Sequence, residues 1–194
     1  MRRLLVPLFV VPALLLALAV PAAAAPPLKE SGTSKSFTSI SSTCSGASCT
    51  DVILDAFSLD NETILVCLNY LTYSTRTGQI RSQESGCTET SSDALTVTSD
   101  VTVSLDPTSI TLAECGRRGC TETRTVTVSA TDSAVGPVFS DVGRGTFSDG
   151  TCTFRYRFES RSAPIAGTMT IDGVTLEQSG GASLSEFTVS SRCG

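Results

Sequence analysis

Apolar and polar residues alternate along most of the chain after residue 36, which is the pattern of β-strands that bury one face. In "LTVTSDVTVSL", residues 95–105, the odd positions are apolar apart from one serine, and the even positions are polar. In "CTFRYRFE", residues 152–159, a cysteine and three aromatic residues alternate with polar and charged ones. Each segment therefore predicts a long strand with one face toward a core and one toward water.

Turn signals separate the predicted strands. Asp172-Gly173 suits a two-residue type I′ turn, because both central residues of that turn need positive φ. This turn would pair Ile171 with Val174, and "FSDGTC" at 147–152 supplies a second turn. Strands of this length at a spacing of about 8–12 residues, with almost no helical periodicity, predict an all-β fold: an antiparallel β-sandwich, immunoglobulin-like in its general architecture.

The chain has eight cysteines and no histidine. An even number of cysteines, in a chain that the N-terminal segment described below directs to an oxidising compartment, predicts a fold stapled by disulfides. Two Cys-x4-Cys pairs could supply four thiolates to zinc, but free thiols outside the cytoplasm would need protection from oxidation. We therefore expect disulfides and neither a metal nor a cofactor.

Strand register suggests one of the bridges. "ETILVCLNYLTY", residues 62–73, predicts a strand, and the turn "STRTGQ" that follows sends the chain back antiparallel to it. In that register Cys67 lies opposite Cys87 and Tyr73 opposite Arg81. Facing residues in a non-hydrogen-bonded antiparallel pair have Cα atoms about 4.5 Å apart, which is near the lower limit for a disulfide.

Each Cys-x4-Cys pair closes a four-residue loop containing glycine, which permits positive φ at the bend. Closing the second loop places Ile110 opposite Thr125 and turns Val126 to the other face, so a bulge beside the turn is needed to reconcile them. The last two cysteines lie in phase with aromatic residues, and we expect their bridge to be buried. The predicted bridges are Cys44–Cys49, Cys67–Cys87, Cys115–Cys120 and Cys152–Cys193.

The N-terminal segment is typical of a secretory signal peptide. Arg2 and Arg3 precede an apolar run over residues 4–20, and four alanines follow. The run is short for a membrane-spanning helix, and it ends in alanines and prolines and not in charged residues. The sequence thus predicts a cleaved signal peptide over 1–24, a flexible tail over 25–35, and a secreted mature chain without a transmembrane segment.

The strand-rich region covers residues 36–194, and its length suits one compact sandwich. Two lobes, 36–92 and 93–194, are the alternative, because each half contains four cysteines and one Cys-x4-Cys turn. Without the two leader arginines the chain has 12 basic and 19 acidic residues, a net charge of −7. This balance argues against a general role in binding nucleic acid or anionic membranes.

Several kinds of catalysis are excluded by residue type. Without histidine there is no Ser-His-Asp or Cys-His system, and paired cysteines supply no thiolate. The remaining option is a carboxylate pair from Asp51, Asp55, Asp60 and Glu62, although the sequence places no two of them at a working separation. The stretch Asp60-Asn61-Glu62 also offers oxygen donors to calcium, and a solvated turn is the alternative.

Two arginine pairs are candidate binding residues. Arg117 and Arg118 occupy the tip of a disulfide-closed loop, where they could meet an acidic partner or enter the specificity pocket of a trypsin-like protease; an ordinary exposed turn is the alternative. Arg155 and Arg157 share the polar face of their strand and could form an anion-binding stripe with Arg144. The alternative is pairing with carboxylates on neighbouring strands.

These observations predict a secreted, non-catalytic β-sandwich protein that works by binding or as a surface component. Its expected partner is an extracellular protein or an acidic ligand. An inhibitor of trypsin-like proteases acting through Arg117 and Arg118 is the first alternative. A carboxylate-dependent hydrolase is the second.

Overall fold

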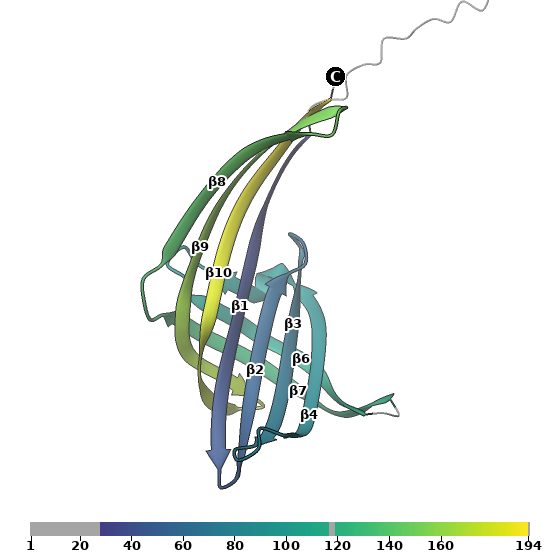
Figure 1. The fold of residues 1–194 in the computed structure, drawn as a ribbon, viewed down its shortest axis with the longest axis vertical. Coiled ribbons are helices and arrows are strands. Elements are labelled where there is room, and N and C mark those ends of the chain that lie inside the picture. Colours follow the sequence, from purple (N-terminus) through teal and green to yellow (C-terminus); the bar gives the residue numbers. More distant parts are fainter. Residues whose placement is uncertain (1–27, 117–118, 194) are drawn as a thin grey trace, which may run out of the picture.

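The computed structural model describes residues 28–116 and 119–193, and antiparallel strands make up nearly all of this part of the chain (Figure 1). The all-β antiparallel class predicted from the alternation is therefore confirmed. Within these two ranges, no helix has the length and apolar character needed to cross a bilayer. The elements are β1 (Lys29–Ser45), β2 (Ser48–Ser58), β3 (Thr63–Ser74), β4 (Ile80–Ser91), the 3-10 turn η1 (Ser92–Ala94), β5 (Leu95–Val97), β6 (Val103–Gly116), β7 (Gly119–Ala134), β8 (Phe139–Ser148), β9 (Cys152–Ile171) and β10 (Val174–Cys193).

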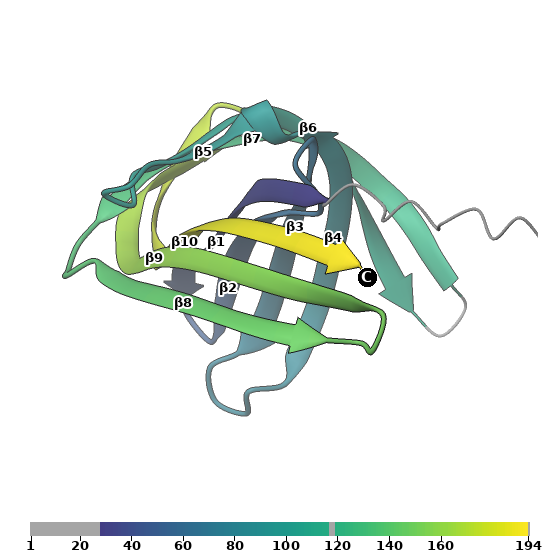
Figure 2. The same ribbon diagram turned by 90° about the horizontal axis from the view of Figure 1, so that it is seen from above.

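All ten strands belong to one sheet, in the order β10-β1-β2-β3-β4-β6-β7-β9-β8, with β5 paired to β6. Because β9 also pairs with β10, the sheet closes into a ring, and Figure 2 shows the strands curling round. The predicted division into two sheets is not what the strands form. The reason lies in β9, which is 20 residues long: one of its edges pairs with β10, and the other pairs with β8 toward the start of the strand and with β7 toward its end.

The outer parts of four strands extend beyond the ring, as Figure 1 shows. We call this extension the arm; it consists of β8, residues 152–162 of β9, residues 183–193 of β10 and residues 29–36 of β1. Residues 29–35, predicted to be a flexible tail, instead form the first part of β1. They do so because the outer half of β10 offers an edge whose backbone groups need a partner.

One hydrophobic core fills the ring and draws on both halves of the chain. Leu54 and Leu68 come from the first half, and Ile110 and Met169 come from the second; all four are fully buried. The alternative lobes 36–92 and 93–194 thus share a single core cluster.

The predicted long strand over 95–105 is interrupted. β5 and β6 form a hairpin in which Leu95 faces Leu105, and the chain turns between them at Val101, where φ is 60°. All three residues are buried, so the apolar positions face the core as the alternation indicated. What the alternation did not reveal is the turn, in which the Val101 amide donates to the carbonyl of Thr98.

The type I′ turn is confirmed. Asp172 and Gly173 have φ values of 49° and 82°, and Ile171 pairs with Val174. The extended β9–β10 ladder therefore starts from a turn with the predicted geometry.

The β6–β7 hairpin contains the β-bulge that the sequence analysis required to bring the apolar residues of both strands to one face. The register shifts between Leu112 and Ala113, so that Ile110 lies opposite Val126. A second shift, in the β3–β4 pair, places Tyr73 opposite Ile80 and not opposite the predicted Arg81. Bulges of one residue are compatible with strong alternation on either side, which is why the pattern did not locate this second shift.

The structure joins the same four cysteine pairs that the sequence predicted, and all eight cysteines are paired. All four bridges connect residues directly opposite each other on adjacent antiparallel strands. Cys44–Cys49 and Cys115–Cys120 lie at hairpin turns, and Cys67–Cys87 lies within the β3–β4 ladder. The Cys152–Cys193 bridge, expected to be buried, lies at the outer end of the arm, where both cysteines are only partly buried.

Candidate functional site

Side chains alternate between two faces along the arm, because β9 and β10 hold one continuous register from the ring to the tip. In β9 the odd-numbered residues lie on the same side as Ala163 and Ile165, which are buried inside the ring. The even-numbered residues lie on the opposite side. We call these the inner face and the outer face of the arm.

The inner face gathers five exposed cationic side chains from four adjacent strands. Arg155 and Arg157 come from β9, and Arg144 of β8 lies directly opposite Arg157. Arg192 comes from β10, and Lys29 of β1 pairs with the β10 residue that faces Arg155. We call these five residues the cationic cluster. The stripe predicted from the sequence is thus brought together and widened by two residues from the ends of the chain.

Acidic side chains begin on this face only in the next cross-strand row toward the ring. There Glu159 of β9 lies opposite Glu186 of β10. Arg161 Nη2 lies 2.9 Å from Glu159 Oε1, so this acidic row has its own compensating cation. The row marks the inner limit of the cationic cluster.

Like charges directly opposite each other on two strands are destabilising unless an opposite charge relieves them. Glu84 and Glu114 form another acidic pair, and Arg124 Nη2 lies 3.1 Å from Glu84 Oε2. The described part of the chain contains only these two side-chain ion pairs, the Arg124–Glu84 pair and the one at Glu159. Arg144 and Arg157 therefore face each other without a carboxylate within ion-pair distance.

A depression of about 280 Å³ opens beside the cationic cluster near the tip of the arm. It is lined by Arg155, Arg192 and the hydroxyl-bearing Thr153, Ser190 and Ser191. Guanidinium groups and hydroxyls are the donors that bind phosphate, sulfate and carboxylate oxygens. The lining is thus chemically suited to an oxyanion.

A larger depression, of about 650 Å³, lies at the base of the arm, and Lys35, Asn61 and Glu186 are among the residues that line it. Its lysine has a structural role, because Lys35 Nζ donates to the carbonyl oxygens of Ser92 at 3.2 Å and Leu95 at 2.7 Å. These bonds tie η1 and β5 to β1. The depression therefore offers a weaker anion site than the tip.

Aromatic rings occupy the outer face of the arm. Tyr156 of β9 pairs with Gly145 of β8, and a Cβ added to this glycine would lie only 2.4–2.6 Å from the tyrosine side chain, so the ring covers the glycine. In the next pair toward the tip, Phe147 and Phe154 stack with their ring centroids 4.7 Å apart. Rings laid over edge glycines help to hold an edge strand in register. They keep β8 on β9 and so present the arginines of the inner face from an ordered sheet.

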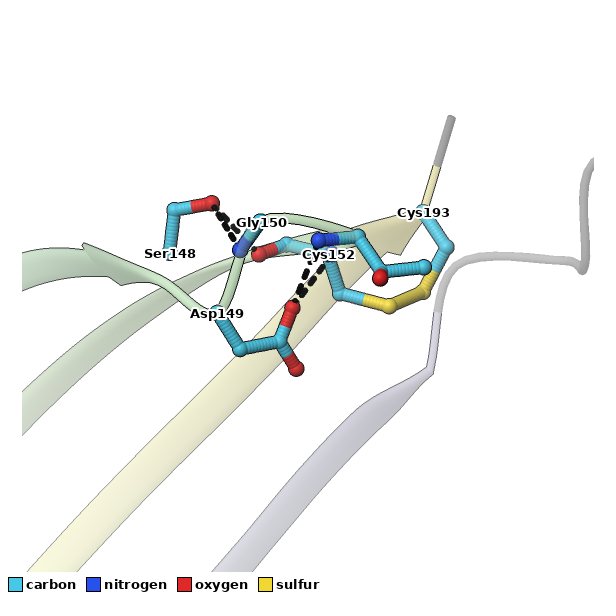
Figure 3. The surroundings of a disulfide bond; sticks show 6 residues. Ser148, Asp149, Gly150, Cys152 and Cys193 are labelled. Carbon is cyan, nitrogen blue, oxygen red and sulfur yellow. Dashed lines mark hydrogen bonds between the residues drawn. A yellow bond between two sulfur atoms is a disulfide. The ribbon is translucent and has the colours of Figure 1, made fainter.

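The tip of the arm is fixed by a turn and a disulfide, as Figure 3 shows. Asp149 Oδ1 accepts hydrogen bonds from the backbone amides of Cys152 at 2.7 Å and Thr151 at 2.9 Å, and these bonds lower the pKa of the Asp149 carboxyl. Gly150 supplies the positive φ of 93° that the turn needs. The Cys152–Cys193 bridge then joins β9 to β10 one residue beyond Arg192.

The other predicted arginine pair, Arg117 and Arg118, lies outside the described residues. The bridge beneath it is described: Cys115 lies opposite Cys120, and both are exposed. Figure 1 shows the β6–β7 hairpin extending away from the ring at this end.

The candidate catalytic carboxylates on β2 are separated along one strand. Asp51 and Asp55 lie on the outward side of β2, four residues or about 13 Å apart, and paired carboxylates in glycosidases work at about 5–9.5 Å. Asp51 accepts a hydrogen bond from the Ser42 hydroxyl and Asp55 one from the Thr38 hydroxyl, each at 2.7 Å. Both carboxylates thus connect β1 to β2 on the surface of the sheet.

Asp60 forms the turn that precedes β3. Its Oδ1 accepts hydrogen bonds from the Thr63 hydroxyl at 2.8 Å, the Glu62 amide at 2.8 Å and the Thr63 amide at 2.6 Å. These bonds, the hydroxyl one first, hold the pKa of the Asp60 carboxyl below its usual value. All three bonds lie within the exposed turn that connects β2 to β3.

Sequence reasoning missed a buried polar group inside the ring. Asp132 of β7 is only 1% exposed, and its Oδ2 accepts a hydrogen bond from Gln178 Nε2 of β10 at 2.6 Å. Ser39 of β1 donates to the side-chain oxygen of Gln178. The signal was present, because Asp132 is in phase with the buried Val126 and the other apolar residues of β7.

Comparisons with known proteins leave the chain without a family. No protein-family model matches it, and neither does any curated protein. Among solved structures, a Nitrosomonas europaea protein described as an AttH is similar at 12% identity with a TM-score of 0.24. The alignment covers 80% of this chain and 51% of that protein, so the chain spans about half its length.

Proposed function

We propose that the chain is an exported, non-catalytic binding protein that holds an acidic ligand on the inner face of its arm. The observation that carries this proposal is the unrelieved pair of Arg144 and Arg157, which lie directly opposite each other on β8 and β9. Lys29, Arg155 and Arg192 extend the same face.

The argument rests on the cost of this arrangement. Opposed like charges destabilise a strand pair, whereas opposite charges at the same positions contribute roughly 0.2–1 kcal/mol relative to a neutral pair, so a stability-optimised sheet would place glutamate opposite arginine. Sites that break a local rule without compensation within the fold are expected at functional surfaces. An acidic ligand supplies the missing opposite charge, and arginine binds carboxylates and phosphates through two parallel hydrogen bonds.

Export is supported by two features. Four disulfides are compatible with an oxidising compartment, and the N-terminal segment has the pattern of a secretory signal peptide, although residues 1–24 lie outside the described part of the chain. The disulfide at the tip of the arm also stabilises the proposed binding surface under extracellular conditions.

The test uses a sulfonate cation-exchange matrix at pH 7 and low salt. A chain of net negative charge should flow through unless a local basic surface binds the matrix. We expect the wild-type mature protein to be retained and an Arg155→Gln/Arg157→Gln variant to elute at lower salt. The control is Arg76→Gln/Arg81→Gln, which removes the same charge near the β3–β4 turn. Flow-through of the wild type, or equal elution of both variants, would contradict the proposal.

A second candidate function, inhibition of trypsin-like proteases, is favoured by the Cys115–Cys120 bridge at the end of the projecting β6–β7 hairpin. A loop closed by its own disulfide loses little freedom on binding. Titration of trypsin with the wild type and with an Arg117→Ala/Arg118→Ala variant tests it. Inhibition by the wild type alone would support this function, and negligible inhibition by both would remove it.

A further inference from the structure

The cationic cluster is distributed in a way that matches an extended ligand better than a small one. Its five members occupy three successive cross-strand rows on four adjacent strands, from Arg144 on β8 to Lys29 on β1. With strands about 4.8 Å apart, these two residues are separated by about 14 Å across the sheet. A single phosphate or carboxylate group reaches two or three of the five cations at most.

The acidic row sets the direction in which such a ligand can lie. Glu159 and Glu186 face each other immediately inside the row of Arg157, so negative charge cannot continue from the tip toward the ring. The favourable path runs across the strands, from the free edge of β8 to the outer part of β1. Hydroxyl groups of Thr146 and Ser190 lie between the cations on this path and can donate to further anionic oxygens.

Aromatic side chains lie on the wrong side for single-stranded nucleic acid. Phe154, Tyr156 and Phe158 of β9 all belong to the outer face, as do Phe147 and Phe187 on the neighbouring strands. Proteins that bind single strands stack bases on aromatic rings beside the basic groove. On the inner face the charged backbone of a polymer is the feature that would be recognised.

We infer that the ligand is a linear polyanion, a chain of repeating phosphate or carboxylate groups, that lies across the four strands of the arm on the cationic cluster. This inference rests on the proposed function and specifies its ligand class. The polymer is held by several weak, exposed charge contacts in parallel. Its affinity therefore grows with chain length and falls steeply with salt, because each contact releases a counterion.

The experiment measures binding of orthophosphate, tripolyphosphate and long-chain polyphosphate to the mature protein by calorimetry at low salt. We expect affinity to rise at least about a hundredfold from orthophosphate to the long chain. Arg144→Gln and Lys29→Gln remove the two ends of the path. Each variant should bind the long-chain polyphosphate about threefold to tenfold more weakly than the wild type does. Tripolyphosphate is too short to reach both ends of the path, so at least one of the two variants should bind it with an affinity within about twofold of the wild type. Arg76→Gln is the matched control. An unchanged midpoint of thermal unfolding verifies that each of the three variants keeps the fold.

The outcomes separate the two proposals. If tripolyphosphate binds as tightly as the long chain, or if neither end variant weakens the long chain, the polyanion inference is overturned while anion binding by the arm stands. If no phosphate species binds, and poly-glutamate of similar length also fails, both proposals fall. Binding of poly-glutamate without polyphosphate supports the inference with carboxylate as the repeating group.

Discussion

Gln178 and Asp132 meet inside the ring across a strand that separates them. The Gln178 Nε2 group of β10 donates to Asp132 Oδ2 of β7 at 2.6 Å, and between them on β9 lies Gly167, which pairs with both residues. Because glycine has no side chain, the amide and the carboxylate can reach each other over it. Asp132 Oδ1 has no hydrogen-bond partner in the described part of the chain, and burial raises the pKa of the Asp132 carboxyl to about 6.

This raised pKa predicts a pH-dependent stability. The folded carboxyl titrates near 6 and the unfolded one near 3.8, so between these values the folded state binds more protons than the unfolded state. The free energy of unfolding should therefore fall as pH rises from about 4 to above 6, by up to about 3 kcal/mol from this group. An Asp132→Asn variant lacks the ionisation, and we expect it to be more stable than the wild type at pH 8 and nearly equal at pH 4.

Urea unfolding of both proteins from pH 3.5 to pH 8 checks this difference, because contributions from other titrating groups cancel between them. Asp141→Asn, at an exposed position of β8, is the control, and its unfolding free energy should differ little from that of the wild type at every pH. A constant offset between wild type and Asp132→Asn at every pH would show that the ionisation of Asp132 is not coupled to folding.

Gly167 should tolerate no side chain. A Cβ at this position would lie 2.1 Å from the carbonyl oxygen of Thr131 and 2.7 Å from Asp132 Oδ1, and the first of these contacts is with backbone. We expect Gly167→Ala to cost about 2 kcal/mol or more of unfolding free energy, because the β7–β9 ladder must shift. Gly181→Ala is a matched control on β10, since its Cβ would meet nothing closer than 3.9 Å. Equal stability of the two variants by chemical denaturation would refute this account.

Strand class, the type I′ turn and the two short-loop disulfides followed from local pattern, because alternation and turn chemistry are properties of neighbouring residues. Cys67–Cys87 followed from the register across a turn, and Cys152–Cys193 was the pair that remained. Closure of the sheet did not, since it depends on β9 pairing with β7 along one half and with β8 along the other. No alternation in "CTFRYRFE" distinguishes a strand inside a ring from one that leaves it. For the same reason the aromatic side of this segment was expected to face the core.

The candidate site could be predicted in part. Arg155 and Arg157 are two residues apart on one strand, so their shared face follows from sequence alone. Lys29 could not be added, because it joins the cluster only through the pairing of β1 with β10. Arg192 joins through the β9–β10 ladder, whose register follows from the Asp172-Gly173 turn, but the turn alone does not show that the ladder continues to the tip. Asp132 was overlooked although its phase was visible, because a charged residue at a core position is easily taken for the end of the buried segment.

The bridge between Cys152 and Cys193 should contribute more to stability than the bridge between Cys115 and Cys120. The first joins residues 41 apart in sequence and the second residues 5 apart. A disulfide restricts the unfolded chain more when its loop is longer, which corresponds to about 4 kcal/mol for the long loop and about 2 kcal/mol for the short one. The Cys152→Ser/Cys193→Ser variant should therefore unfold at a lower urea concentration than the Cys115→Ser/Cys120→Ser variant. Neither pair is fully buried, so differences in packing contribute little.

Hydrogen exchange in the arm gives a second measurement of the Cys152–Cys193 bridge. Without this bridge the tip strands lose their covalent link, and amide exchange should accelerate in β8 and in residues 152–162 while the ring stays protected. Uniform acceleration across ring and arm would mean instead that the bridge acts on the whole fold through the unfolded chain alone.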